Sequence, residues 1–276
     1  MRRLVWLLAL AACGGDDSGG GDDGGGGGPD ASVPSNNGFV QLSAYNAVAS
    51  ATPIVGGSAS ASFVTTAATS SCTQHTVGAC DVYVCSTTTP TQSYASDGTI
   101  TITGLAQAVT LTPQSNNMYA PFSTQQAPLF SGGETVTLHG TGGTAPAFTL
   151  MVTMPSRATI TSPTKPAGTS GSVTIQRSQD FSASWTGGGA GKLYLYVSGP
   201  SGSGATVSCG FDASAGTGKI PAAALSMLPA GMGSFSAASL AVKTLDMTDW
   251  RIYGQGFFNA VWAADTSMAA ATATLQ

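Results

Sequence analysis

Residues 181–211 read FSASWTGGGAGKLYLYVSGPSGSGATVSCGF, and the alternation of apolar and polar side chains in this stretch decides the fold. Successive side chains of a β-strand point to opposite faces, so a period of two predicts strands with one packed face. Gly-, Ser- and Pro-rich turns divide the stretch into three such strands. The predicted core-facing side chains are Phe181, Ala183, Trp185, Leu193, Leu195, Val197, Val207, Cys209 and Phe211.

The same short alternating runs recur on both sides of this stretch. They lie at 61–65, 82–85, 99–103, 109–112, 135–139, 148–153, 173–176 and 257–262. Many brief strands of this kind predict an all-β fold built of antiparallel β-sandwiches of the immunoglobulin-like type. One exception is IPAAALSMLP at 220–229, where Pro221 can begin and Pro229 can end a short helix.

Domain size favours two tandem sandwiches over one large one. We place their junction in MPSRATITSPTKPAG (154–168), whose three prolines limit continuous sheet pairing. The resulting prediction is a first domain at 36–156 and a second at 157–276. No sharp internal repeat relates the two halves.

The N-terminus has the pattern of an export signal. Arg2 and Arg3 precede an apolar run, LVWLLALAA, that is far shorter than the roughly 20 residues of a membrane-spanning helix. The run ends in Leu10-Ala11-Ala12-Cys13, which resembles the lipobox of bacterial lipoproteins. That resemblance implies cleavage after residue 12 and a diacylglyceryl group on Cys13. Gly14 stands where the inner-membrane retention signal of that family has Asp, which favours the outer membrane. The alternative is an ordinary secretory signal with a chance cysteine.

Residues 14–35, GGDDSGGGDDGGGGGPDASVPS, contain almost no apolar side chains and predict a disordered tether, so 13–35 form a lipidated cysteine with its linker. Its five aspartates lack the alternating ligand positions of a calcium loop. From residue 36 onward seven Lys and Arg face eight Asp and Glu. This balance excludes a basic face for nucleic acid.

Four further cysteines suit an exported protein. In CTQHTVGACDVYVC (72–85), a two-residue turn at Gly78-Ala79 places Cys72 opposite Cys85, within disulfide reach. The rival pairing of Cys72 with Cys80 closes a shorter loop and stays open, because connectivity does not follow from spacing. Cys80 and Cys209 are expected on packed faces as buried free thiols.

A family resemblance covers most of residues 57–230. The segments that support it are GSASASFV, GACDVYVC, GTITITG, IQRSQDFSASWTGG, VSCGF and IPAAALSMLP. In them the chain resembles uncharacterised surface lipoproteins of predatory, myxobacterial-type bacteria. That family implies no known activity, and the shared motifs are structural.

Catalytic, cofactor and metal motifs are missing from the sequence. His75 and His139 have no metal-ligand spacing, and GGGAGK at 187–192 lacks the first glycine and the Ser or Thr of a phosphate loop. Asp246 with Asp249 could form an acid pair of the glycosidase kind, but turn residues fit them better. We expect a protein that is not an enzyme and that carries no cofactor or metal.

Aromatic side chains form the candidate binding surface. If Leu193, Leu195 and Val197 face the core, Tyr194 and Tyr196 face outward together. Such a pair is a platform for a sugar ring or a protein partner, or simply covers a sheet. The sequence therefore predicts an exported lipoprotein, anchored in the cell envelope through Cys13, with a non-catalytic structural or protein-binding ectodomain whose partner is an envelope protein. The alternative is a carbohydrate-binding surface module.

Overall fold

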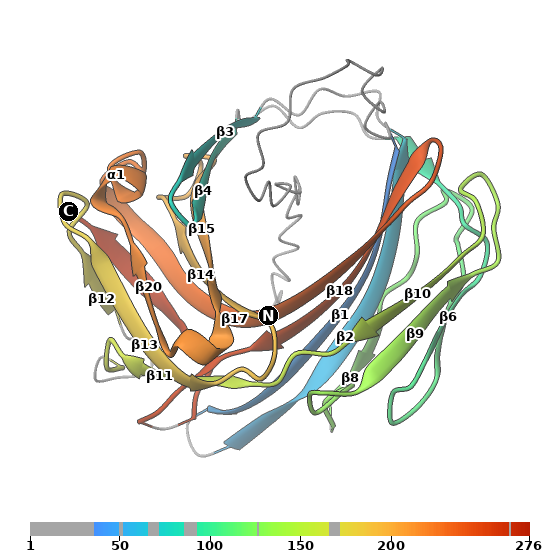
Figure 1. Cartoon of the computed structure of the whole chain (residues 1–276), viewed down its shortest axis with the longest axis horizontal. Coiled ribbons are helices and arrows are strands. Elements are labelled where there is room, and N and C mark those ends of the chain that lie inside the picture. The colour runs from blue at the N-terminus through green and yellow to red at the C-terminus, as the bar shows by residue number, and fades with distance from the viewer. Residues whose placement is uncertain are drawn as a thin grey trace, which may run out of the picture. The chain divides into compact units, whose positions relative to one another are not determined.

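The computed structural model confirms that the chain is all-β with several sheets (Figure 1). It describes residues 36–49, 52–65, 72–85, 93–125, 127–165, 172–264 and 266–276, which belong to one compact unit, Pro34–Gln276. The predicted signal peptide, Cys13 and the tether lie outside the described residues. No helix in the described ranges has the length and apolar character needed to cross a membrane.

Twelve strands form one long sheet, whose main path runs β3-β4-β15-β14-β17-β18-β1-β2-β5. Two further strands, β12 and β20, join it at β17, and β8 pairs with β2. Its members are β1 (Asn36–Ala49), β2 (Thr52–Thr65), β3 (Cys72–Val77), β4 (Cys80–Cys85), β5 (Ser93–Ala95), β8 (Phe122–Thr124), β12 (Ser172–Ile175), β14 (Lys192–Ser198), β15 (Ala205–Asp212), β17 (Gly231–Asp246), β18 (Trp250–Asn259) and β20 (Ala270–Leu275).

Two four-stranded sheets complete the strand inventory of the described chain. The first runs β10-β9-β6-β7, with β6 (Ile100–Thr103), β7 (Val109–Leu111), β9 (Thr135–Gly140) and β10 (Phe148–Thr153). The second runs β16-β13-β11-β19, with β11 (Ala158–Ser162), β13 (Phe181–Gly187), β16 (Thr217–Ile220) and β19 (Val261–Trp262). The helical turns are η1 (Ala213–Ala215) and α1 (Ala222–Leu225).

Each four-stranded sheet covers its own hydrophobic core on the long sheet. The Trp185 core contains Trp185, Leu193, Leu195, Val197, Cys209, Phe235 and Trp262. The Phe63 core contains Leu42, Phe63, Leu138, Phe148, Val152, Trp250 and Phe258. Apolar side chains alternate with polar ones along these strands, as the period of two predicts.

Strand β17 connects the two cores. Its side chains Phe235 and Ala237 lie in the Trp185 core, and Ala241 and Leu245 pack against the Phe63 core. All four positions are odd-numbered and thus point to one face of an unbroken strand. Both four-stranded sheets therefore lie on the same face of the long sheet (Figure 1). We call the opposite face, which receives the even positions of β17, the second face.

Strand pairing crosses the junction predicted between residues 156 and 157. Strand β18 from the C-terminal half pairs with β1, and β4 from the N-terminal half pairs with β15. The physical reason is the length of β17, whose 16 residues carry the chain from one core to the other without a break. The sequence boundary is one of several places where the chain passes between the cores, and it does not divide the sheets.

The sheets differ in one respect from the antiparallel sandwiches that the sequence predicts, because three strand pairs are parallel. They are β1 with β18, β11 with β19 and β12 with β20. In each pair the partners come from distant parts of the chain, so no hairpin imposes the antiparallel direction.

The short helix predicted within 220–229 is present as α1, with Pro221 at its N-cap position. The N-cap has no side-chain hydrogen bond of its own. Instead, Asp180 accepts a hydrogen bond from the Ala222 N–H at 2.8 Å, which satisfies a donor at the helix start. Asp180 also pairs with Lys219 at 2.8 Å, so the turn before β13 is fixed against β16.

Asp97, between β5 and β6, has a fully buried carboxyl at the end of the Phe63 core. Neither carboxylate oxygen has a hydrogen-bond partner within bonding distance. Burial raises the pKa of Asp97 from 3.8 to about 7, and the nearby Gly142 N–H offsets this only in part. The Tyr119 hydroxyl fixes the backbone here: it accepts from the Asp97 N–H at 3.0 Å and donates to the Gly98 carbonyl at 2.8 Å.

This carboxyl makes stability depend on pH. Between pH 3.8 and about 7 the folded chain holds a proton on Asp97 that the unfolded chain has released, so the free energy of unfolding falls as pH rises through this window, by roughly 4 kcal/mol in all. We expect Asp97→Asn to flatten this slope and to raise stability at about pH 8. Urea unfolding at about pH 5 and pH 8 measures the effect. An equal slope in the variant contradicts the assignment, and Asp249→Asn, at an exposed acid, is the control.

Candidate functional site

The second face of the long sheet gathers aromatic side chains from four strands. Strand register decides which residues reach it, because pairs directly opposite each other share a face. Tyr194 lies opposite Ala238 of β17, and Phe257 lies opposite Leu240. The aromatic side chains on this face are Tyr83, Tyr194, Tyr196, Tyr253, Phe257, Phe39 and Tyr45.

The predicted pair Tyr194 and Tyr196 stacks on this face, with ring centroids 6.0 Å apart and an interplanar angle of 16°. Gly210 of β15 lies opposite Tyr194, and a Cβ at that position would lie 2.9 Å from the Tyr194 ring. Glycine is thus required there for the ring to lie close over the sheet. Tyr194 is half-buried.

Tyr196 differs from the prediction, which had both rings exposed to solvent. It is only 5% exposed, because it lies among neighbouring side chains that include Tyr194. Its hydroxyl is buried without a hydrogen-bond partner. Burial raises the pKa of both phenols, and the charge of Asp81 raises that of Tyr194 further. Both side chains are therefore neutral phenols at neutral pH.

A second stacked pair, Phe39 and Tyr253, was missed by the sequence reasoning. The two residues lie directly opposite each other in the parallel β1–β18 register, with ring centroids 4.9 Å apart and an angle of 6°. Phe39 is half-buried and Tyr253 is buried. A signal was present: Val40, Leu42 and Ala44 alternate in β1, which assigns Phe39 to the other face.

Register arranges these aromatics along a diagonal of the sheet. Each of two steps, Tyr83 to Tyr196 and Tyr194 to Phe257, crosses two strands and advances two residues. With strands about 4.8 Å apart and a rise of about 3.3 Å per residue, each step is about 12 Å. Uncharged polar side chains of β1, β2 and β18 adjoin the Phe257 end of the diagonal, namely Gln41, Ser43, Ser58, Ser60, Ser62 and Gln255.

Few charges lie on the second face, and most of them are paired. Arg251 donates to both Asp246 oxygens, at 2.6 and 3.0 Å, and Lys192 lies 3.9 Å from Asp212. Asp81 accepts a hydrogen bond from the Thr76 hydroxyl at 2.8 Å. The bidentate contact with Arg251 leaves Asp246 unsuited to an acid pair with Asp249. The face can stack planar or ring-shaped groups and exchange neutral hydrogen bonds, and it offers no strong field for a highly charged ligand.

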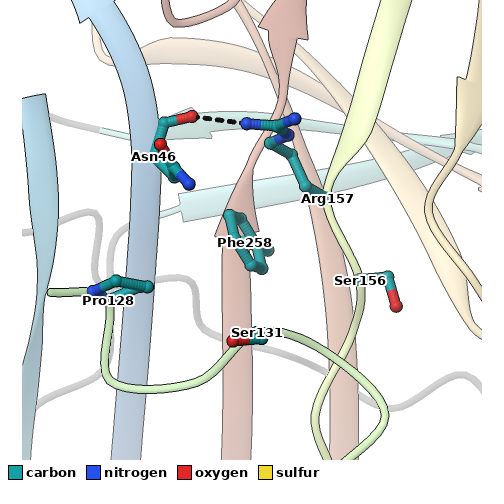
Figure 2. Close-up of a pocket in the computed structure, with 6 residues that line it drawn as sticks. All are labelled: Asn46, Pro128, Ser131, Ser156, Arg157 and Phe258. Atoms are coloured by element: carbon teal, nitrogen blue, oxygen red, sulfur yellow. Dashed lines mark hydrogen bonds between the residues drawn. The ribbon is translucent and has the colours of Figure 1, made fainter. Parts of the chain in front are cut away.

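A pocket of about 330 Å³ lies between β1, β18 and the linker that joins β10 to β11 (Figure 2). Its lining combines the Phe258 ring with polar groups of Asn46, Ser131, Ser156 and Arg157. The Arg157 guanidinium donates to the Asn46 carbonyl at 2.8 Å, which ties the linker to β1. This pocket lies on the Phe63-core side of β18 and is separate from the aromatic diagonal.

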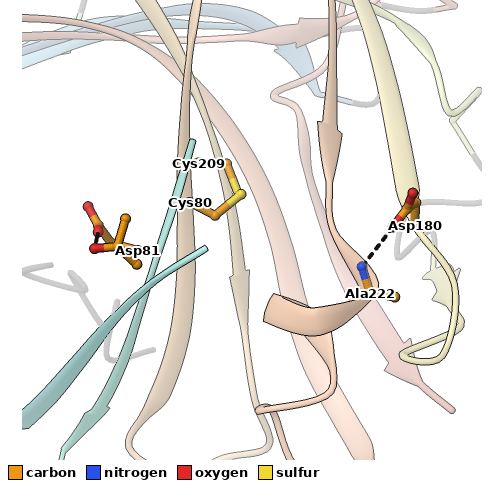
Figure 3. Close-up of a disulfide and its surroundings, with 6 residues drawn as sticks. Cys80, Asp81, Asp180, Cys209 and Ala222 are labelled. Carbon is orange, nitrogen blue, oxygen red and sulfur yellow. Dashed lines mark hydrogen bonds between the residues drawn. A yellow bond between two sulfur atoms is a disulfide. The ribbon is translucent and has the colours of Figure 1, made fainter. Parts of the chain in front are cut away.

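Two disulfides hold the β3–β4 hairpin. Cys72 is bonded to Cys85 across the hairpin, which is the pairing that the turn geometry favoured. Cys80 is bonded to Cys209 of β15 inside the Trp185 core (Figure 3). The expectation that Cys80 and Cys209 are free thiols was wrong. They lie directly opposite each other in the β4–β15 register, a pairing between distant strands that spacing along the chain does not reveal.

The described residues contain no group of three or more His, Cys, Asp or Glu side chains that could hold a metal ion. His75 is exposed on β3, and His139 on β9 shares a hydrogen bond of 3.1 Å with the Thr149 hydroxyl. The two histidines lie in different sheets and are not brought together.

Comparisons with known proteins find only weak structural similarities. No family model and no curated protein matches the chain. Among solved structures, a Ca²⁺-stabilised ice-binding adhesin of an Antarctic bacterium is 11% identical, with a TM-score of 0.18, over 73% of this chain and 55% of that one. A part of a 1.5-MDa bacterial ice-binding adhesin is 14% identical, with a TM-score of 0.18, over 82% and 77%. Similarities this low support no statement about function.

The two disulfides should differ in their contribution to stability. In the chain-entropy model the stabilisation grows with the closed loop, so separations of 13 and 129 residues correspond to about 3 and about 5 kcal/mol. We expect the double variant Cys80→Ala/Cys209→Ala to lose more stability than Cys72→Ala/Cys85→Ala in non-reducing urea unfolding. The reverse order, or peptide mass mapping that finds other pairings, contradicts this assignment.

Proposed function

We propose that this chain is an exported, lipid-anchored lipoprotein that acts without catalysis and binds a partner through the second face of its long sheet. The observation that carries the proposal is the pair of aromatic stacks, Tyr194 with Tyr196 and Phe39 with Tyr253, on a face that neither four-stranded sheet covers. Aromatic side chains supply large contact area together with a polar tip, and they are enriched in binding surfaces.

The anchor in this proposal is the lipid on Cys13. Export is supported by the disulfides, since such bonds form and persist outside reducing compartments. Two or three acyl chains bind a membrane essentially permanently, because each buried methylene contributes about 0.8 kcal/mol. Residues 14–35 would tether the sheets to the envelope, with the outer membrane favoured by Gly14.

The proposed partner is a protein of the cell envelope. Carbohydrate is the second candidate, and a specific observation favours it: beyond the Phe257 end of the aromatic diagonal, the side chains of β1 and β2 on this face are largely hydroxyls and amides. Such groups match the hydroxyls of a neutral glycan, whose ring faces stack on Tyr and Phe. A non-catalytic role is supported by the paired state of Arg251 and Asp246, the charged residues at the end of this face.

The anchor has a direct test. We expect wild-type chain in its producing cell to incorporate a clickable fatty acid and to be retained in the membrane fraction, because the Cys13 thiol accepts the lipid. Cys13→Ser should abolish the label and release the chain or leave its precursor uncut. Mass spectrometry that finds an unmodified mature start at another residue rejects the anchor.

The binding face is tested by Tyr194→Ala, which removes the half-buried ring and leaves both cores untouched. We expect retention on cell-envelope fractions to fall at least about tenfold, the loss typical of an anchor side chain at an interface. Tyr194→Phe, which keeps the ring, should retain most of the binding.

The matched control is Met151→Ala, which removes a 62%-exposed apolar side chain from β10, away from the second face. Protease-treated envelopes and a panel of neutral polysaccharides separate the two partner classes. Loss of binding after protease supports the protein partner, and Tyr194-dependent binding to a polysaccharide supports the second candidate. Equal binding by wild type and Tyr194→Ala throughout rejects the second face as the site.

A further inference from the structure

Strand β3 forms one end of the long sheet, and within the described residues its outer edge is unprotected. Among the described strands it pairs only with β4. Its first five residues are exposed, so both of its faces are open and only Val77 packs against the Trp185 core. Of the other strands at sheet ends, β5, β7 and β8 have three residues each and β16 has four, whereas β3, like β10, has six.

Natural sheet edges are normally guarded by Lys, Pro, a bulge or a short strand, because free N–H and C=O groups attract another strand. The β3 sequence CTQHTV contains no Lys, Arg, Asp, Glu or Pro. Its register with β4 runs from Cys72↔Cys85 to Val77↔Cys80 without a bulge. None of the usual protective devices is present on this edge.

Hydrogen-bonded and non-hydrogen-bonded residue pairs alternate along the β3–β4 hairpin, and this alternation identifies which backbone N–H and C=O groups of β3 point to its free edge. The Cys85 N–H donates to the Gly204 carbonyl at 2.9 Å, so it points toward β15 and away from β3. The Cys72–Cys85 pair is therefore a non-hydrogen-bonded pair of the hairpin, and the alternation continues along the strand. It follows that Cys72, Gln74 and Thr76 direct their N–H and C=O groups to the free edge.

Both disulfides stiffen this edge, although β3 adds little to a core. Cys72–Cys85 fastens β3 to β4, and Cys80–Cys209 fastens β4 to β15. A two-stranded hairpin with no covering layer is marginal in water, and covalent bonds keep this one extended. A partner strand would meet a preorganised template and would lose less entropy on pairing.

We propose that β3 is a dimerisation edge at which two copies of this chain join their long sheets by antiparallel pairing of β3 with β3. A two-fold axis at Gln74 places Gln74 opposite its own copy and Cys72 opposite Thr76 of the second copy. All outward groups are then used, in about six hydrogen bonds. Since the strand carries no charged side chain, self-pairing brings no like charges together, and the two-fold closes after two copies.

The test uses the full mature chain in detergent micelles, followed by analytical ultracentrifugation over a concentration series. We expect a monomer–dimer equilibrium whose dissociation constant rises at least about tenfold in Gln74→Pro, which removes an outward N–H at an edge position that tolerates proline. Gln74→Lys should have the same effect by placing like charges opposite each other. Gln74→Thr keeps the N–H and should dimerise as wild type does.

Hydrogen exchange gives a second readout that needs no variant. The amides of Gln74 and Thr76 should become protected as concentration rises, while the His75 amide, already bonded to β4, should not change. A wild-type monomer at all concentrations overturns the proposal, as does a dimer that Gln74→Pro leaves intact. Protection of Gln74 and Thr76 that appears only on adding another envelope protein also overturns it, because the edge then takes a foreign strand.

Discussion

Strand β17 runs for 16 residues and pairs with β14, β18 and β20, so its register links the strands of the two cores. Odd positions supply Phe235 to the Trp185 core and Leu245 to the Phe63 core, so the even positions must point to the second face. A slip of one residue would move both apolar sets out of their cores at once. The cores fix the register, and the register in turn fixes which aromatic side chains gather on the second face. Core packing and the composition of the second face are therefore fixed by the same strand.

The strands at the two ends of the long sheet, β5 and β3, differ in length and in covalent cross-linking. At the β5 end the strand is only three residues long, which leaves little edge for another chain. At the β3 end the strand is long, uncharged and covalently held, although only Val77 reaches a core. Burial does not account for two disulfides in a segment of 14 residues, because Cys80 and Val82 of β4 supply most of what the hairpin packs. The two disulfides are better explained by the need to hold the outer edge of β3 extended and in register with β4.

Period-two alternation in the sequence predicts many of the strands around each core, because burial on one side only leaves a visible pattern, but β1, β11, β16, β17 and β20 were not among the predicted runs. The run at 181–211 gives β13, β14 and β15 for this reason, and the turn at Gly78-Ala79 gives the β3–β4 hairpin. Pairings between distant strands leave no such local trace. The parallel β1–β18 pair, the Cys80–Cys209 bond and the Phe39–Tyr253 stack all depend on them. The burial of Tyr196 likewise depends on neighbours that a single strand does not reveal.

The carboxyl whose pKa is shifted most among the described residues, Asp97, lies in the Phe63 core. Catalytic groups commonly have shifted pKa values, and they must also reach a substrate. Asp97 meets the first condition, because burial raises its pKa to about 7, but it is fully buried beside Tyr119 in the Phe63 core. On the second face the charged residues Arg251 and Asp246 neutralise each other, and burial raises the pKa of the Tyr194 and Tyr196 phenols, which are neutral at neutral pH. The shifted carboxyl thus costs stability at neutral pH and is enclosed by the Phe63 core, where no ligand reaches it.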